Sequence, residues 1–135
     1  MSQINFITKK YLIISNSDTI YMINILDYYI DSRLELPYMI YSMINWDDNR
    51  IIVSSYKKIN IWNTEDKLWE FNFSVNNSIG CMSLLSKDEL ITGSHNGTVG
   101  VYNLITQQFK IISEKHFNSI VSLDVLHNKV LIRFG

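Results

Sequence analysis

Three histidines are the side chains of this sequence best suited to metal binding or proton transfer. Their spacing does not match that of a set of metal ligands. His95, His116 and His127 lie in separate predicted loops, between 11 and 21 residues apart. Metal sites combine histidines with cysteines or carboxylates at characteristic spacing, and we find no cysteine or carboxylate at ligand spacing from these three. We interpret His95 as a turn residue and His116 as a structural one, and we expect neither a metal nor another cofactor.

Cys81 and two acidic pairs are the remaining candidates for catalysis, and their surroundings favour structural roles. Cys81 lies in an apolar run, residues 79–85, where a thiol packs as a small hydrophobic group. A nucleophilic cysteine needs a base and an electropositive pocket, which the sequence does not indicate. Asp47-Asp48 and Asp88-Glu89 occupy the same point of two repeats, where solvated turn residues are common. These patterns predict a protein that is not an enzyme.

The composition describes a chain that folds as one domain, and it disfavours several classes of partner. The chain has 135 residues, 47% of them hydrophobic and 19% charged, with a formal net charge of -1. Its basic residues are scattered apart from pairs at 9–10 and 57–58, so no basic face for nucleic acid is expected. The single cysteine cannot form an intrachain disulfide, and no apolar run approaches the roughly 20 residues of a membrane span. We predict an intracellular, cytoplasmic protein without nucleic-acid or membrane partners.

Three segments of the sequence superimpose on one another and define a repeat. Residues 12–24, 51–63 and 90–103 each join a β-branched run to an alternating apolar run through a short polar turn. The third turn contains Asn96-Gly97, a pair that favours positive φ at two adjacent positions. Each segment therefore predicts a β-hairpin.

Further strands before and after each hairpin complete a unit of four strands. The preceding strands are predicted at residues 4–7, 40–46, 79–85 and 120–126, and the following strands at 28–33, 68–73 and 109–113. The last preceding strand leads into residues 130–135. The unit recurs every 39 to 41 positions, with Asn24, Asn63 and Asn103 at equivalent points. This period, without helical periodicity, favours an all-β array of four-stranded antiparallel β-propeller blades that stack to bury their apolar faces.

The hairpins resemble those of the WD-repeat β-propeller family. Residues 90–103 are similar to that family's leucine-alanine-serine-glycine-serine hairpin, with its aspartate-glycine-threonine turn and tryptophan-aspartate ending. Ile61-Trp62-Asn63 resembles the same ending, and His116 matches the histidine of the family's glycine-histidine pair, with Lys115 replacing the glycine. Asparagine stands in place of the aspartate in every repeat, so the family's buried polar network is incomplete and apolar packing must stabilise the fold. Another propeller subtype remains an alternative.

The repeats predict a partial propeller of about three and a half WD-type repeats in an incomplete ring. We place them at residues 1–36, 37–75 and 76–116, with a partial repeat at 117–135. Propellers have roughly four to eight blades, so apolar blade faces at both ends would need cover. Two alternatives are open: the chain pairs with itself or with a complementing propeller chain, or it is a fragment of a longer propeller.

The resemblance implies that partners dock on the turns inside the hairpins and on the connections between blades. Those loops are residues 16–19, 56–58 and 95–98, together with 34–38, 74–78 and 115–118. Tyr56, Lys57 and Lys58 join an aromatic ring to two ammonium groups, which suits an acidic or phosphorylated peptide, although a solvated hairpin tip has the same composition. Tyr38 is the second candidate, with packing of a blade connection as the alternative. The predicted partner-binding residues are Leu36, Tyr38, Tyr56, Lys57, Lys58, Asn76, His95, Lys115 and His116.

Two functions are consistent with these patterns. The first is a non-enzymatic scaffold or adaptor that presents propeller loop surfaces to protein partners. The second is a structural subunit or propeller fragment whose open blade edges assemble with itself or with another chain. An adaptor is expected to be soluble alone, whereas an assembly subunit is expected to aggregate or to purify with its neighbour.

Overall fold

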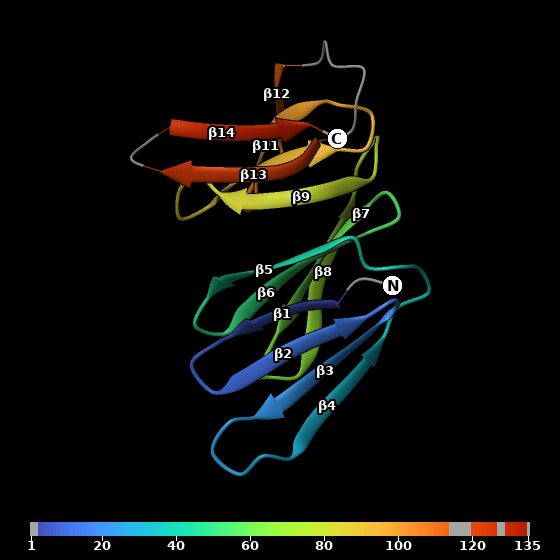
Figure 1. Cartoon of the computed structure of the whole chain (residues 1–135), viewed down its shortest axis with the longest axis vertical. Coiled ribbons are helices and arrows are strands. Elements are labelled where there is room, and N and C mark those ends of the chain that lie inside the picture. The colour runs from blue at the N-terminus through green and yellow to red at the C-terminus, as the bar shows by residue number, and fades with distance from the viewer. Residues whose placement is uncertain (1–2, 114–119, 127–128, 135) are drawn as a thin grey trace.

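Every regular element in the described part of the chain is a β-strand. The computed structural model describes residues 3–113, 120–126 and 129–134. Three four-stranded antiparallel sheets follow one another along the chain, and a two-stranded hairpin comes last (Figure 1).

Each complete sheet, here called a blade, is built from consecutive strands joined by short turns. Blade 1 contains β1 (Gln3–Ile7), β2 (Tyr11–Asn16), β3 (Thr19–Asn24) and β4 (Ile30–Glu35). Blade 2 contains β5 (Ser42–Asp47), β6 (Arg50–Ser55), β7 (Lys58–Asn63) and β8 (Leu68–Ser74). Blade 3 contains β9 (Ile79–Leu84), β10 (Glu89–Ser94), β11 (Val99–Asn103) and β12 (Phe109–Ser113). The last hairpin pairs β13 (Ile120–Leu126) with β14 (Lys129–Phe134).

The blades stack with the first strand of each one beside the first strand of the next. β1 lies near β5, β5 near β9, and β9 near β13 (Figure 1). The described sheets are not closed into a ring. This arrangement confirms the predicted all-β fold of stacked propeller blades in an incomplete ring.

Apolar side chains fill the spaces between the sheets. One cluster joins blade 1 to blade 2, a second joins blade 2 to blade 3, and a third lies between blade 3 and the last hairpin. Strand β2 alternates buried and half-buried residues, whereas β6 is buried from Ile51 to Ser55, because blades cover both of its faces. Each fully buried Ile or Leu side chain contributes about 1.5–3 kcal/mol to stability, so inter-blade packing dominates the energetics.

An asparagine ends the third strand of every blade and caps the turn that follows. Its Oδ1 accepts hydrogen bonds from the backbone N–H groups two and three residues later, at 2.7–3.1 Å, at Asn24, Asn63 and Asn103. An aspartate oxygen accepts the same two bonds. Asparagine therefore caps the turn at the position where the resembling family has an aspartate.

Strand ends differ from the sequence expectation where turns bond to neighbouring segments. The strand predicted at 40–46 is β5, Ser42–Asp47, because the N–H of Ile40 donates to the Ser17 carbonyl at 2.7 Å and holds that residue in the connection. The strand predicted at 28–33 is β4, Ile30–Glu35, because Tyr28 has a positive φ of 57° and closes the turn. In the third hairpin, only Gly97 of the Asn96-Gly97 pair has positive φ, at 86°.

Candidate partner-binding face

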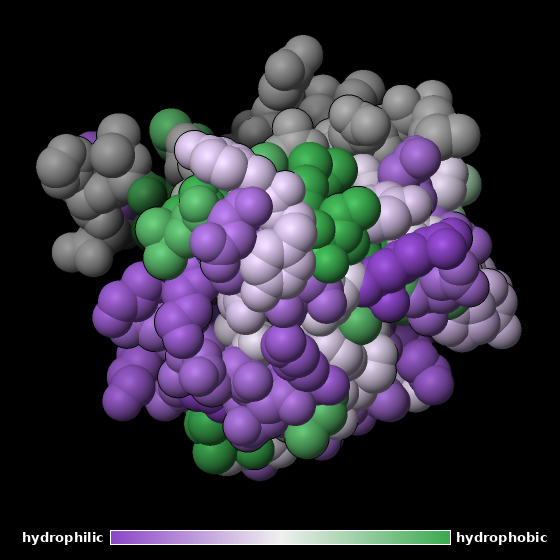
Figure 2. Space-filling view, turned by 90° about the horizontal axis from the view of Figure 1, so that it is seen from below, coloured by the Kyte–Doolittle hydropathy of each residue, from purple (hydrophilic) through white to green (hydrophobic). Residues whose placement is uncertain are grey.

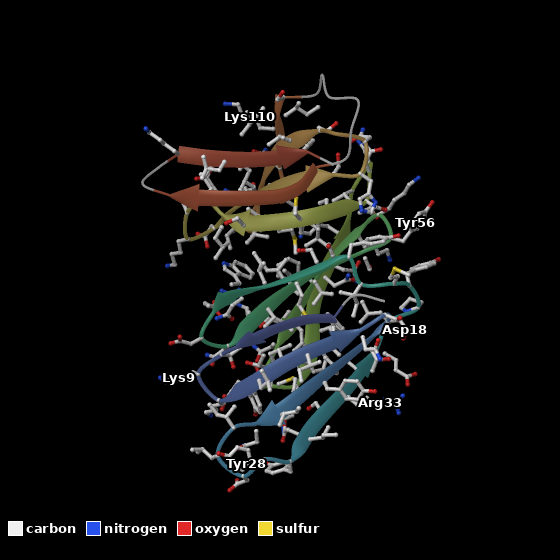
Figure 3. All side chains as sticks on the ribbon, viewed as in Figure 1. Lys9, Asp18, Tyr28, Arg33, Tyr56 and Lys110 are labelled. Carbon is white, nitrogen blue, oxygen red and sulfur yellow. The ribbon has the colours of Figure 1, made fainter. Side chains whose placement is uncertain are left out.

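The hairpin turns and the blade connections meet on one side of the stack, which we call the turn face. It consists of the turns at residues 17–18, 56–57 and 95–98 and the connections at 36–41 and 75–78. Backbone hydrogen bonds join them: Leu36 N donates to Asp18 O at 2.8 Å, Val75 N to Lys57 O at 3.0 Å, and His95 N to Ser78 O at 2.9 Å. Figure 3 shows Asp18 and Tyr56 on this side and Lys9 on the opposite side.

Two exposed tyrosines meet on the turn face, one from the connection between blades 1 and 2 and one from the hairpin of blade 2. The ring centroids of Tyr38 and Tyr56 lie 5.5 Å apart, with an angle of 47° between the rings. Tyr38 is 52% exposed and Tyr56 is 47% exposed. Tyrosines that stay this exposed while fixed by ring contact are suited to contact a partner, because little side-chain entropy remains to be lost.

The basic residues of the second hairpin extend this aromatic pair. Lys57 Nζ lies 5.4 Å from the centroid of the Tyr56 ring. The backbone of Lys57 has a positive φ of 52°, and its N–H donates to Ser78 Oγ at 3.1 Å. The 75–78 connection thus holds the backbone of the 56–57 turn in place and so fixes the positions from which its side chains extend.

A second ring contact lies on the same face and was not predicted. The rings of Tyr41 and His95 meet edge to face, with centroids 4.7 Å apart. Tyr41 is half-buried, while His95 is exposed. Sequence spacing gave no signal for this contact, because the two residues belong to the connection before blade 2 and to a hairpin of blade 3.

The predicted site residues divide into three groups. Tyr38, Tyr56, Lys57, Lys58, Asn76 and His95 are exposed on or beside the turn face. Leu36 is only 7% exposed and packs in the cluster between blades 1 and 2, so little of its side chain is accessible to a partner. Lys115 and His116 lie outside the described residues.

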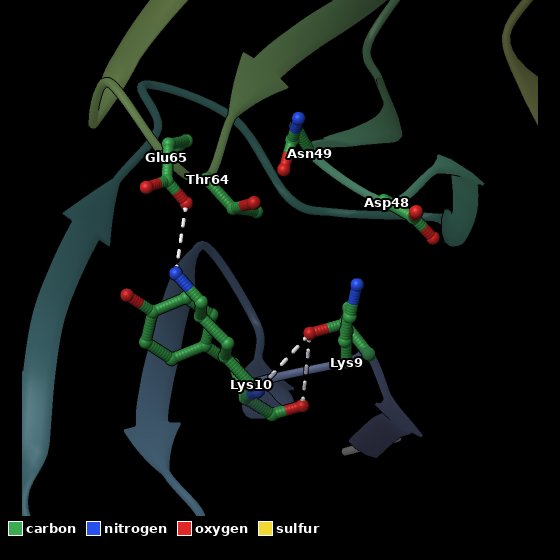
Figure 4. A pocket seen from close by; sticks show the side chains of 8 residues that line it. Lys9, Lys10, Asp48, Asn49, Thr64 and Glu65 are labelled. Carbon is green, nitrogen blue, oxygen red and sulfur yellow. Dashed lines mark hydrogen bonds and ion pairs between the residues drawn. The ribbon is translucent and has the colours of Figure 1, made fainter.

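Two ion pairs lie on the face opposite the turn face. A cavity of about 410 Å³ lies between blades 1 and 2, and in it Lys10 Nζ contacts Glu65 Oε2 at 3.2 Å (Figure 4). Nearby, Lys67 Nζ lies 2.9 Å from Asp31 Oδ2, and this ammonium holds the pKa of Asp31 below its ordinary value. These two ion pairs tie blade 1 to blade 2.

Catalytic and metal chemistry receive no support from the described residues. Burial raises the pKa of the Cys81 thiol to about 11, and Cys81 Sγ lies 3.8 Å from the Gly93 carbonyl oxygen. A thiol with such a pKa carries almost no thiolate near neutral pH. Among the described residues, no three His, Cys, Asp or Glu side chains are grouped closely enough to hold a metal ion. The described segments also contain no helix of the length and apolarity needed to cross a membrane.

Comparison with known proteins identifies the family. A family model described as ciliary BBSome complex subunit 2, middle region, matches residues 39–132, which is more than half of the chain. The chain belongs to this family. No individual curated protein matches the sequence.

Solved structures confirm the β-propeller fold of the chain. The WD40 β-propeller domain of Doa1 gives a TM-score of 0.78 at 14% identity, over 92% of this chain and 43% of that chain. The designed protein Ika4 gives 0.78 at 15% identity, over 96% of this chain and 88% of that one. The designed protein Ika8 gives 0.76 at 16% identity, over 96% of this chain and 42% of that one. The chain thus spans less than half of the Doa1 and Ika8 chains, and at these identities the likeness concerns the fold alone.

The family match covers most, but not all, of the turn face. Tyr56, Lys57, Lys58, Asn76 and His95 fall inside residues 39–132. Tyr38 immediately precedes the matched region of the BBSome subunit 2 family. The aromatic pair therefore joins one residue of the family region to one residue outside it.

Proposed function

We propose that the chain is a non-enzymatic protein-binding module that contacts its partner through the turn face around Tyr38 and Tyr56. The observation that carries this proposal is the pair of exposed tyrosine rings, 5.5 Å apart, contributed by the connection between blades 1 and 2 and by the hairpin of blade 2. Lys57 and Lys58 add positive charge beside the rings, and in the described part of the chain neither lysine forms an ion pair. Tyrosine is typical of the residues that dominate binding energy at protein interfaces, and the lysines favour a partner of opposite charge.

The family supports the general class of this function. Its description is that of a subunit of a complex, and a subunit acts by binding other proteins. The ciliary complex of this family supports an intracellular place of action for this chain. Scaffold or adaptor activity and a non-enzymatic role are parts of our proposal.

Removal of the turn-face side chains tests the proposal. The variant Tyr56→Ala/Lys57→Ala/Lys58→Ala is expected to lose most partner recovery in affinity purification while its circular dichroism spectrum stays unchanged. The matched control Tyr29→Ala/Lys9→Ala/Lys110→Ala removes the same residue types from exposed positions away from the turn face, and Tyr29 is 47% exposed, as is Tyr56. Equal recovery by the native chain and the turn-face variant would refute the proposed surface.

A second candidate function, assembly with a further blade, rests on the face of blade 1 that points away from blade 2. Tyr11, Ile13 and Ser15 are buried toward blade 2, so the alternate residues of β2 and their cross-strand partners lie on the other face. Those partners pair Leu12 with Ile23 and Ile14 with Tyr21. Figure 2 views the molecule from the blade 1 end and shows hydrophobic patches between polar side chains.

The two candidates are separated by native mass measurement. Assembly with a second copy or with another propeller chain predicts a mass above that of one chain, and a return to one chain in the variant Ile14→Lys. An adaptor predicts a single-chain mass with or without this substitution.

A further inference from the structure

A groove between blades 1 and 2 opens beside the turn face, and we call it the inter-blade groove. Its volume is about 250 Å³, and it shares Tyr38 with the turn face. One wall comes from the connection after β4, and the other from strands β7 and β8 of blade 2. The residues that matter for recognition are Glu35, Tyr38, Lys58, Asn60, Trp69 and Asn72.

Two aromatic rings give the groove a fixed apolar surface. Tyr38 is 52% exposed, and Trp69 is 36% exposed. Trp69 meets the buried ring of Trp62 edge to face, with centroids 4.9 Å apart. Because Trp62 is only 5% exposed and packs between the blades, it fixes the position of Trp69. Such rings bind apolar side chains or proline rings without having to be ordered first.

Two asparagines supply hydrogen-bonding groups on the floor of the groove. Asn60 and Asn72 are directly opposite each other on β7 and β8. Asn60 Nδ2 donates to Val53 O at 3.1 Å and to Ser55 Oγ at 3.0 Å, which leaves its Oδ1 to accept from a ligand. An extended peptide has unpaired backbone N–H and C=O groups, and side-chain amides can bond to both.

The lining of the groove contains one cation and one anion, Lys58 and Glu35. Lys58 lines it and contacts no carboxylate among the described residues. Glu35, the acidic residue of the lining, is neutralised by Arg33, whose Nη2 lies 2.9 Å from Glu35 Oε1. With Lys57 on the adjoining turn, the uncompensated charge favours an acidic ligand.

The corresponding space between blades 2 and 3 lacks this combination. There Phe109 occupies the position of Trp69 and stacks on Tyr102, with centroids 4.3 Å apart. The Phe109 ring covers Gly100, which stands at the position of Asn60. Thr98 takes the place of Lys58. Among the described blades, the amide floor and the lysine therefore occur together only in the inter-blade groove.

We infer that the inter-blade groove binds an extended acidic segment of a partner protein. An acidic side chain of the segment pairs with Lys58, an apolar or proline residue lies against Tyr38 and Trp69, and its backbone bonds to the asparagine amides. This inference rests on the proposed function, because it specifies the chemistry of the partner that the turn face contacts.

Fluorescence polarisation with a defined probe tests the inference. The probe is a fluorescein-labelled ten-residue peptide of alternating glutamate and proline with a central leucine, and its neutral counterpart has glutamine in place of glutamate. We expect the acidic probe to bind at least about tenfold more tightly than the neutral one, and more weakly as salt increases. Lys58→Glu is expected to weaken binding at least about tenfold, while the same charge reversal at the distant Lys110→Glu leaves it nearly unchanged.

Further variants separate failure of the groove from failure of the turn face. Trp69→Ala, checked for folding by circular dichroism, is expected to weaken binding of the acidic probe, as Lys58→Glu does. Absence of binding by the acidic probe overturns the inference, as does equal weakening by Lys58→Glu and Lys110→Glu. If Tyr56→Ala abolishes binding of the probe while Lys58→Glu and Trp69→Ala do not, the groove is excluded and the turn face stands.

Discussion

The indole Nε1 of Trp46 donates a 2.8 Å hydrogen bond to the carbonyl oxygen of Lys87, 41 residues later in the chain. This bond ties the first strand of blade 2 to the turn between β9 and β10 of blade 3. The Arg50 guanidinium lies over the Trp46 ring, 3.6 Å from its centroid, and Arg50 Nη2 contacts Asp47 Oδ2 at 2.6 Å. Trp46 thus combines burial, a hydrogen bond between blades and a cation–π contact.

Trp46→Phe is expected to destabilise the fold by about 1–3 kcal/mol, because it leaves the Lys87 carbonyl without its donor and shrinks a buried ring. The measurement is urea unfolding followed by circular dichroism. Trp69→Phe is the control: Trp69 is 36% exposed, and no hydrogen bond from its indole occurs among the described residues, so its loss is expected to be smaller. Equal losses for the two variants would contradict this role of Trp46.

The repeat period and the hairpins were predictable from the sequence because each is encoded locally. Alternating apolar residues and short polar turns specify β2 with β3, β6 with β7, and β10 with β11. The role of the asparagines was not predicted, because the sequence shows only that they replace an aspartate. Their capping bonds depend on the turn geometry, in which an amide oxygen acts as a carboxylate oxygen does.

The candidate site was predictable as a set of loops but not as a set of contacts. Tyr38 and Tyr56 were both candidates, yet their pairing depends on how the connection after blade 1 crosses the second hairpin. Leu36, two residues before Tyr38, was assigned to the same surface, but its side chain packs inward. The directions of side chains in an irregular connection follow no regular period along the sequence. Buried and exposed neighbours could therefore not be distinguished from the sequence.

Asparagine at position 63 has a second role that distinguishes it from Asn103. Asn63 Nδ2 donates to Glu70 Oε1 at 2.6 Å, while Asn63 Oδ1 caps the turn. Asn63→Asp keeps the cap but sets two carboxylates against each other, so we expect a loss of about 1 kcal/mol or more at pH 7. The double variant Asn63→Asp/Glu70→Gln keeps the same cap without opposed carboxylates, and its stability is expected to lie closer to the native value.

Urea unfolding of both variants at pH 7 and pH 4 measures this difference. Protonation of either carboxyl should restore part of the stability lost in Asn63→Asp, so its deficit is expected to shrink at the lower pH. Equal behaviour of the two variants at both pH values would show that Glu70 does not matter.

The ion pair between Asp31 and Lys67 predicts a pH dependence of stability with a defined sign. The Lys67 ammonium lowers the pKa of Asp31 in the folded chain. The stabilisation is therefore fully present above the ordinary aspartate pKa of about 4 and is lost as pH falls through the lower folded value. We expect Lys67→Met to be less stable than the native chain at pH 6 and to approach it under strongly acidic conditions.

Thermal unfolding across this pH range measures the effect, with Lys10→Met as the matched control. Lys10 contacts Glu65 in the same region, but both side chains are more than half exposed, at 58% and 54%, so solvent screens the pair. If Lys10→Met reduces the dependence of stability on acidic pH as much as Lys67→Met does, the ionisation of Asp31 is not the source of that dependence.

Packing around Gly100 distinguishes the space between blades 2 and 3 from the inter-blade groove. A Cβ at this position would overlap the Phe109 ring, and the Lys110 carbonyl oxygen would lie 3.1 Å away. Because Phe109 is stacked on Tyr102, the ring cannot move aside without losing that contact. Gly100→Ala is therefore expected to lower the free energy of unfolding by about 1–3 kcal/mol.

In the double variant Gly100→Ala/Phe109→Leu the added methyl group has room, so the combined loss of stability is expected to be smaller than the sum of the two single losses. Urea unfolding of the two single variants and the double variant gives this coupling, and strictly additive losses would mean that Phe109 is not what requires glycine at position 100.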